Sequence, residues 1–64
     1  MIFRQLFDPV SSTYTYLLGC EASGEAVLID PVINAMDRDL AILHALGLRL
    51  AYTLDTHIHA DHIT

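Results

Sequence analysis

The pattern of apolar and polar residues predicts a β-strand over Thr13–Cys20. This segment is rich in β-branched and aromatic residues, which favour strands. Its alternating residues Tyr14, Tyr16, Leu18 and Cys20 share one face. We expect the two tyrosines to pack in a core. We expect Cys20 to be a small buried hydrophobic residue rather than a redox-active thiol.

The next segment completes a β-hairpin with this strand. Ala22–Glu25 contains a glycine at a place where a hairpin turn needs a positive φ. Ala26–Ile29 is a continuous apolar run, which is typical of a strand buried on both faces. Asp30 and Pro31 end this strand, because proline cannot donate a hydrogen bond to a sheet. A shorter strand over 3–7 precedes the hairpin.

A helix and a last strand follow the hairpin. We expect Asn34 to cap the helix and Gly47 to end it. Four apolar residues recur at helical spacing: Met36, Leu40, Leu43 and Leu46. Leu48–Thr56 is then a strand whose alternation puts four residues on one face: Leu48, Leu50, Tyr52 and Leu54. The chain is therefore predicted to form a β-hairpin followed by a β-α-β unit, an α/β architecture.

The β-α-β unit determines which side chains meet. A right-handed crossover through a helix makes the two flanking strands parallel, so their carboxyl ends lie at the same edge of the sheet. Asp30 follows one of these strands and His57 follows the other. Because open α/β sheets bind ligands outside the carboxyl ends of their strands, we expect Asp30 to lie near the residues that begin at His57.

Charge and composition narrow the classes of partner. The 64 residues include 8 acidic and 3 basic side chains, for a formal net charge of -5. This balance argues against binding to nucleic acid or to an anionic membrane. No apolar run approaches the ~18–20 residues of a membrane span. The first residues do not resemble a signal peptide, and one cysteine cannot form an internal disulfide, so we expect a reducing, cytoplasmic setting.

The strongest chemical signal lies directly after the last strand. Six residues hold three imidazoles and a carboxylate: His57, His59, Asp61 and His62. Two histidines that are two residues apart point to one side of an extended segment, and the other two groups follow where the chain turns. Such a set suits Zn(II), Fe(II), Mn(II) or a pair of such ions. The alternative, chance histidines in a polar loop, is disfavoured by their density.

Two residues near the motif have two interpretations each. Asp30 could orient a metal-binding histidine through a hydrogen bond, or it could simply cap the end of a strand beside Pro31. Thr56 could support the metal loop through its hydroxyl group, although an ordinary strand residue is the expected interpretation.

The motif and three further segments carry a family resemblance. Residues 56–62 resemble the signature of the metallo-β-lactamase superfamily. Within that superfamily, residues 12–19, 25–32 and 46–64 are similar to the persulfide dioxygenases, also called sulfur dioxygenases or ETHE1-type proteins. Glyoxalase II hydrolases share the fold and the motif, but they often carry histidine at the place of Ile58.

The resemblance implies a fold, a metal and a reaction. The fold is an αββα sandwich, of which residues 1–64 form the N-terminal part of one domain. The metal is a mononuclear Fe(II) that serves the oxidation of glutathione persulfide by O2 to sulfite and glutathione. The resemblance makes His57 an iron ligand, together with a later histidine and aspartate. It places His59, Asp61 and His62 in or around the site, with Asp61 as the candidate catalytic residue.

Alternatives to this function remain open. In a glyoxalase II-type hydrolase of glutathione thioesters, His57 and His59 would bind one Zn(II), and Asp61 and His62 a second. The sequence stops two residues after the motif, so we expect it to be incomplete and unable to complete either metal site alone. A non-catalytic truncated remnant is the third hypothesis. A longer parent protein could be a homodimer.

Overall fold

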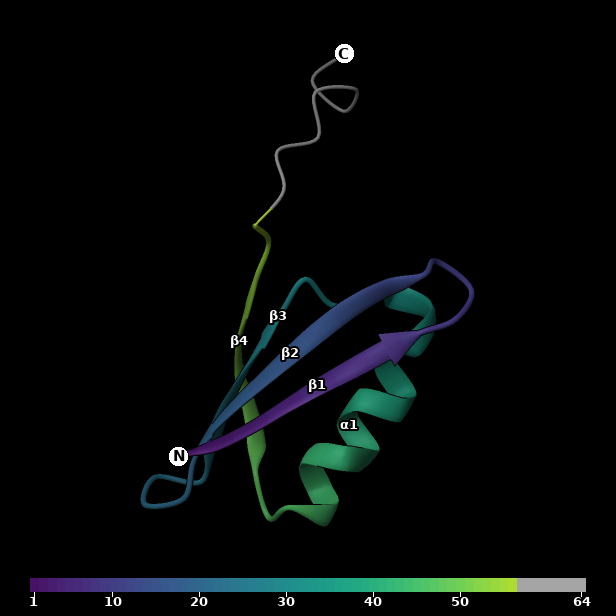
Figure 1. The fold of residues 1–64 in the computed structure, drawn as a ribbon. Helices are drawn as coiled ribbons and strands as arrows, with labels where there is room; N and C mark the ends of the chain where they lie inside the picture. Colours follow the sequence, from purple (N-terminus) through teal and green to yellow (C-terminus); the bar gives the residue numbers. More distant parts are fainter. Residues whose placement is uncertain (57–64) are drawn as a thin grey trace.

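The strand-forming residues of the first half build an antiparallel meander, and a helix returns the chain to it (Figure 1). The computed structural model describes residues 1–56. Its elements are β1 (Ile2–Asp8), β2 (Thr13–Cys20), β3 (Glu25–Ile29), η1 (Ile33–Ala35), α1 (Met36–Ala45) and β4 (Arg49–Leu54). The strand order is β1-β2-β3-β4, with β1–β2 and β2–β3 antiparallel and β3–β4 parallel. The predicted hairpin and β-α-β unit are confirmed.

The hydrophobic core lies between α1 and one face of the sheet (Figure 1). It consists of five buried residues: Leu17, Ala26, Leu28, Leu43 and Leu48. Gly19 makes room for this packing, because a Cβ atom there would lie 2.5 Å from Cδ1 of Leu48. Among residues 1–56, no helix is long and apolar enough to cross a membrane.

The tyrosines of β2 lie on the other face, so the prediction that they pack in this core was wrong. The buried residues of β2 are Thr15, Leu17 and Gly19, whereas Tyr14 is 47% exposed. Both faces of β2 have strand-like side chains, and the position of α1 decides which of them is buried. The aromatic rings instead contact one another across the sheet, as in Phe7 and Tyr14, whose centroids are 5.2 Å apart.

A β-bulge changes the faces of β4. Ala26 pairs with Leu50, but Val27 pairs with Tyr52, so Ala51 is an extra residue on β4. The predicted strict alternation is therefore wrong beyond Leu50. Leu50 packs against the core, and Tyr52 shares the open face with its partner Val27.

The other expectations for buried residues were met in part. Only one face of β3 is covered by the described residues, since Leu28 is buried and Ile29 is partly exposed. Leu40 is 37% exposed rather than a core residue of the helix. Asn34 does not cap α1. It lies in η1, where the chain tightens into a 3₁₀ turn, and the capping position is occupied by Ala35 without a side-chain hydrogen bond.

An ion pair fastens the start of α1. The carboxylate of Asp39 is fully buried, and its Oδ1 accepts hydrogen bonds from Nε and Nη2 of Arg38, at 3.1 and 3.0 Å. Arg38 also donates to the carbonyl oxygen of Phe7 at the end of β1. The bond from Arg38 to Phe7 therefore joins α1 to the end of β1, and removal of the arginine would leave the buried carboxylate of Asp39 without its ion-pair partner.

The sheet face opposite α1 is predicted to drive self-association of the isolated 64-residue chain. This open face carries Phe3, Phe7, Tyr14, Tyr52 and Leu54, each at least 45% exposed. Contiguous apolar surface of this kind associates in water. Light scattering should show concentration-dependent oligomers, which Tyr52→Lys reduces. Ile33→Lys, at an apolar residue on η1 that is even more exposed than Tyr52, is the control and should leave association unchanged. A monomer at all concentrations would contradict the prediction.

Candidate functional site

The carboxyl ends of β3 and β4 meet at one edge of the sheet. Asp30 follows directly after β3, and Thr56 comes two residues after the end of β4. The parallel pairing of the two strands, with Ile29 opposite Leu54, places both residues at this edge. The topology predicted from the sequence therefore brings Asp30 beside the residue that precedes His57.

The carboxylate of Asp30 binds both donors of Thr56. The backbone N–H of Thr56 donates to Oδ1 of Asp30 at 2.7 Å, and the Thr56 hydroxyl donates to Oδ2 at 2.5 Å. We call this pair of hydrogen bonds the Asp30–Thr56 clamp. Bonds to an ionised acceptor are among the stronger hydrogen bonds in proteins. Thr56 therefore lies beyond the end of β4 and is hydrogen-bonded to Asp30, whereas the sequence favoured an ordinary strand residue.

The backbone of Asp30 adopts an unusual conformation. Its φ is 56°, in the left-handed region, which costs roughly 1–2 kcal/mol for a residue with a Cβ atom. Such conformations persist where surrounding contacts determine them. The N–H of Asp30 donates to the carbonyl oxygen of Leu54 at 2.7 Å, and the Asp30 carbonyl accepts from Oγ1 of Thr15 at 2.9 Å. Asp30 is therefore held on both sides of its Cα atom.

The proposed metal ligands lie outside the described residues. His57, His59, Asp61 and His62 all follow residue 56, and their roles stay predictions. Within residues 1–56, no three His, Cys, Asp or Glu side chains gather in a way that could hold a metal ion. The donor set of the motif, three imidazoles and a carboxylate, fits a divalent transition metal. The Asp30–Thr56 clamp holds Thr56, the residue directly before His57.

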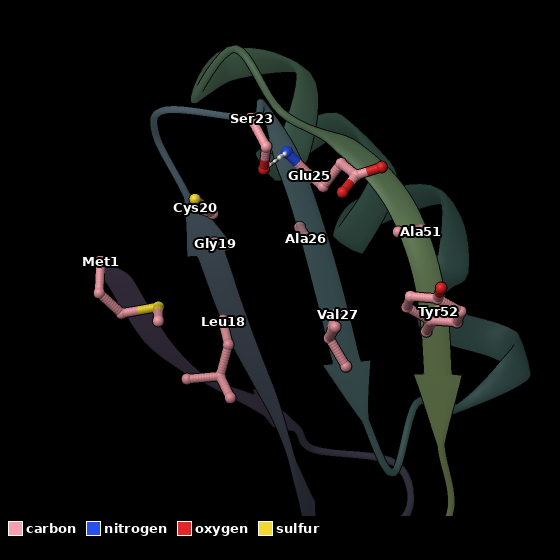
Figure 2. Close-up of a pocket in the computed structure, with 10 residues that line it drawn as sticks. All are labelled: Met1, Leu18, Gly19, Cys20, Ser23, Glu25, Ala26, Val27, Ala51 and Tyr52. Carbon is pink, nitrogen blue, oxygen red and sulfur yellow. Dashed lines mark hydrogen bonds between the residues drawn. The ribbon is translucent and has the colours of Figure 1, made fainter.

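The open face also carries a shallow hollow of about 280 Å³ (Figure 2). Leu18, Val27 and Tyr52 line it, and Cys20 lies at its rim near Ser23 (Figure 2). Cys20 is exposed, so its predicted role as a buried hydrophobic residue was wrong. Hydrogen bonds from the side chain and backbone of Ser23 lower the pKa of the Cys20 thiol.

Thr15 is a residue of this region that sequence reasoning missed. It is fully buried and reaches Asp30 from the neighbouring strand β2. In the sequence it is one threonine among the β-branched residues of a strand, and nothing there distinguishes it. Only the pairing of β2 with β3 points to Thr15, because Thr15 lies one residue beyond the Tyr16–Ile29 pair and therefore opposite Asp30.

Comparison with known proteins decides the family. The family model of the Metallo-beta-lactamase superfamily matches residues 8–64. The chain belongs to the metallo-β-lactamase superfamily. Its four-stranded mixed sheet and helix correspond to the N-terminal part of that fold, as in the crystal structure of ETHE1 from Myxococcus xanthus. That structure superimposes with a TM-score of 0.88 and 62% identity, over 95% of this chain and 27% of its own.

Curated members of the superfamily show two levels of similarity. The mitochondrial persulfide dioxygenase ETHE1 of Homo sapiens is 58% identical over 64 residues, which are 100% of this chain and 25% of the relative. The hydroxyacylglutathione hydrolase of Rhodospirillum rubrum is 38% identical over 53 residues, 83% of this chain and 20% of the relative. This chain therefore spans between a fifth and a quarter of the length of these two curated relatives.

The lowered pKa of Cys20 leads to a testable prediction about its reactivity. Because the thiolate is the reactive form, alkylation by iodoacetamide should have a lower pH midpoint than that of an ordinary cysteine thiol measured alongside. Ser23→Ala removes the main hydrogen bond and should slow alkylation at pH 7.5. Ser11→Ala, in the other turn, is the control. The rates are measured by mass spectrometry at low protein concentration. Equal rates for Ser23→Ala and the unaltered chain would contradict the assignment.

Proposed function

We propose that the whole protein containing this chain is an iron-dependent persulfide dioxygenase. The observation that carries the proposal is the 58% identity with the human persulfide dioxygenase over the full 64 residues. The reaction would convert glutathione persulfide, O2 and water to glutathione, sulfite and two protons. The persulfide's outer sulfur is oxidised, its S–S bond breaks, and O2 is the electron acceptor. The superfamily supports the presence of a metal, and Fe(II) is part of the proposal.

Residues of this chain would have three roles at the proposed site: metal binding, lining of the surrounding space, and positioning of the first ligand. His57 would bind the iron, and His59, Asp61 and His62 would line the surrounding space, with Asp61 as the catalytic carboxylate. When bound, iron supplies the capacity to activate O2. The Asp30–Thr56 clamp would hold the backbone directly ahead of His57, so that its imidazole enters the site from a fixed point.

A hydrolase is the second candidate function. It is supported by the hydroxyacylglutathione hydrolase of Rhodospirillum rubrum, which is 38% identical to this chain. In that case two Zn(II) ions would occupy the motif, and the substrate would be a glutathione thioester. The lower identity and shorter match make this the less supported proposal. Both substrates contain glutathione, so a glutathione-derived ligand is common to the two.

Compartment and assembly belong to the same proposal. A cytoplasmic setting stays a prediction, drawn from the one cysteine, Cys20, among these 64 residues. We also propose that the whole protein forms a homodimer, and we assign none of residues 1–56 to its interface.

Metal content and O2 consumption together test the proposed function. The purified whole protein should contain one iron per chain and consume O2 only when glutathione persulfide is supplied. His57→Ala should remove both the iron and the activity, because an iron ligand is lost. His44→Ala is a matched control, since His44 is exposed in the last turn of α1. Two zinc ions per chain together with hydrolysis of S-lactoylglutathione would instead establish the hydrolase.

A further inference from the structure

Thr15 places a polar group where an apolar one would pack. Its side chain is 0% exposed, as are those of Leu17 on the same strand and Leu28 on the next. Valine has nearly the same shape and would fill this space without a group that needs a hydrogen bond. The hydroxyl of Thr15 therefore calls for an explanation, which its hydrogen bond to the carbonyl oxygen of Asp30 supplies.

The hydroxyl holds the peptide group that joins Asp30 to Pro31. Oγ1 of Thr15 donates to the carbonyl oxygen of Asp30 at 2.9 Å, across the β2–β3 pair. That carbonyl belongs to a residue with a φ of 56°, whose N–H is already held by Leu54. With both peptide groups of Asp30 fixed, the direction of its Cα–Cβ bond is fixed too. The carboxylate is thereby aimed at the end of β4.

We infer that Thr15 is a positioning residue for the metal site, acting through Asp30 and Thr56. Hydrogen bonds link Thr15 to the Asp30 carbonyl and the Asp30 carboxylate to Thr56. The peptide bond from Thr56 to His57 then completes the path from Thr15 to the metal-binding motif. The inference rests on the proposed metal-binding function of His57. It adds that a buried hydroxyl on β2, remote in sequence from the motif, determines how tightly the motif binds its ion.

Metal affinity of the whole protein is the direct test. Groups that orient metal ligands change affinity by about 10–100-fold when removed. Thr15→Val should weaken Co(II) binding by at least about 10-fold in competition with a chelator, and should alter the Co(II) absorption spectrum. Thr15→Ser keeps the hydroxyl and should restore both. Thr13→Val is the matched control, since Thr13 is on the same strand and its hydroxyl contacts Ser11, 2.7 Å away.

A second variant separates positioning from general stability. Thr56→Val removes one bond of the clamp at an exposed residue and leaves the core intact, so it tests the path even if Thr15→Val fails to fold. If both act through Asp30, the losses of Thr15→Val and Thr56→Val should be less than additive in the double variant. Unchanged Co(II) affinity in Thr56→Val, or in a folded Thr15→Val, would overturn the inference.

The outcome is independent of the proposed reaction. Co(II) affinity does not depend on whether the protein oxidises persulfide or hydrolyses a thioester. If the unaltered protein binds metal but does not consume O2, the dioxygenase proposal fails and the role of Thr15 is still decided by the variants. If O2 is consumed and the variants bind Co(II) as tightly as the unaltered protein, the role of Thr15 fails alone.

Discussion

Asp30 is the junction on which the carboxyl edge of the sheet depends. Its N–H binds Leu54, its carbonyl accepts from Thr15, and its two carboxylate oxygens hold Thr56. One residue thus connects β2, β3 and the chain beyond β4. The left-handed backbone of Asp30 ends the extended course of β3, in which a side chain would project from a face of the sheet, and its carboxylate instead reaches Thr56 beyond β4. These contacts offset the cost of that conformation and determine it.

Packing on the helix side determines which residues remain on the open face. Gly19 lets Leu48 approach β2, and Leu48 lies in one buried cluster with Leu17, Leu28 and Leu43. The bulge at Ala51 then turns Tyr52 away from α1. A strand without the bulge would direct Tyr52 toward the helix. The extra residue therefore assigns a large aromatic side chain to the open face, and the five buried residues of the core cluster beneath α1 are all aliphatic.

Sequence patterns predicted the elements well and the faces poorly, for a physical reason. Strand formation at 13–20 depends on β-branched and aromatic residues, which the sequence displays. Burial depends on which face the helix covers, and both faces of β2 offer acceptable side chains: Thr15 and Leu17 on one, Tyr14 and Tyr16 on the other. A bulge depends on the pairing of two strands and leaves no mark in either one. The meeting of Asp30 with the end of β4 was predictable because it follows from topology alone.

The sheet and helix form a scaffold that two different reactions can share. Persulfide dioxygenases and hydroxyacylglutathione hydrolases both resemble this chain, so the sheet, the helix and the edge at Asp30 are compatible with either reaction. An edge that holds Thr56, the residue before the first histidine of the motif, would serve one iron ion or two zinc ions alike. Selection between them must come from the ligands that complete the coordination sphere and from the residues that meet the substrate. The described residues contribute what both proposed reactions need, a hydrogen-bonded residue, Thr56, directly ahead of the proposed metal-binding motif.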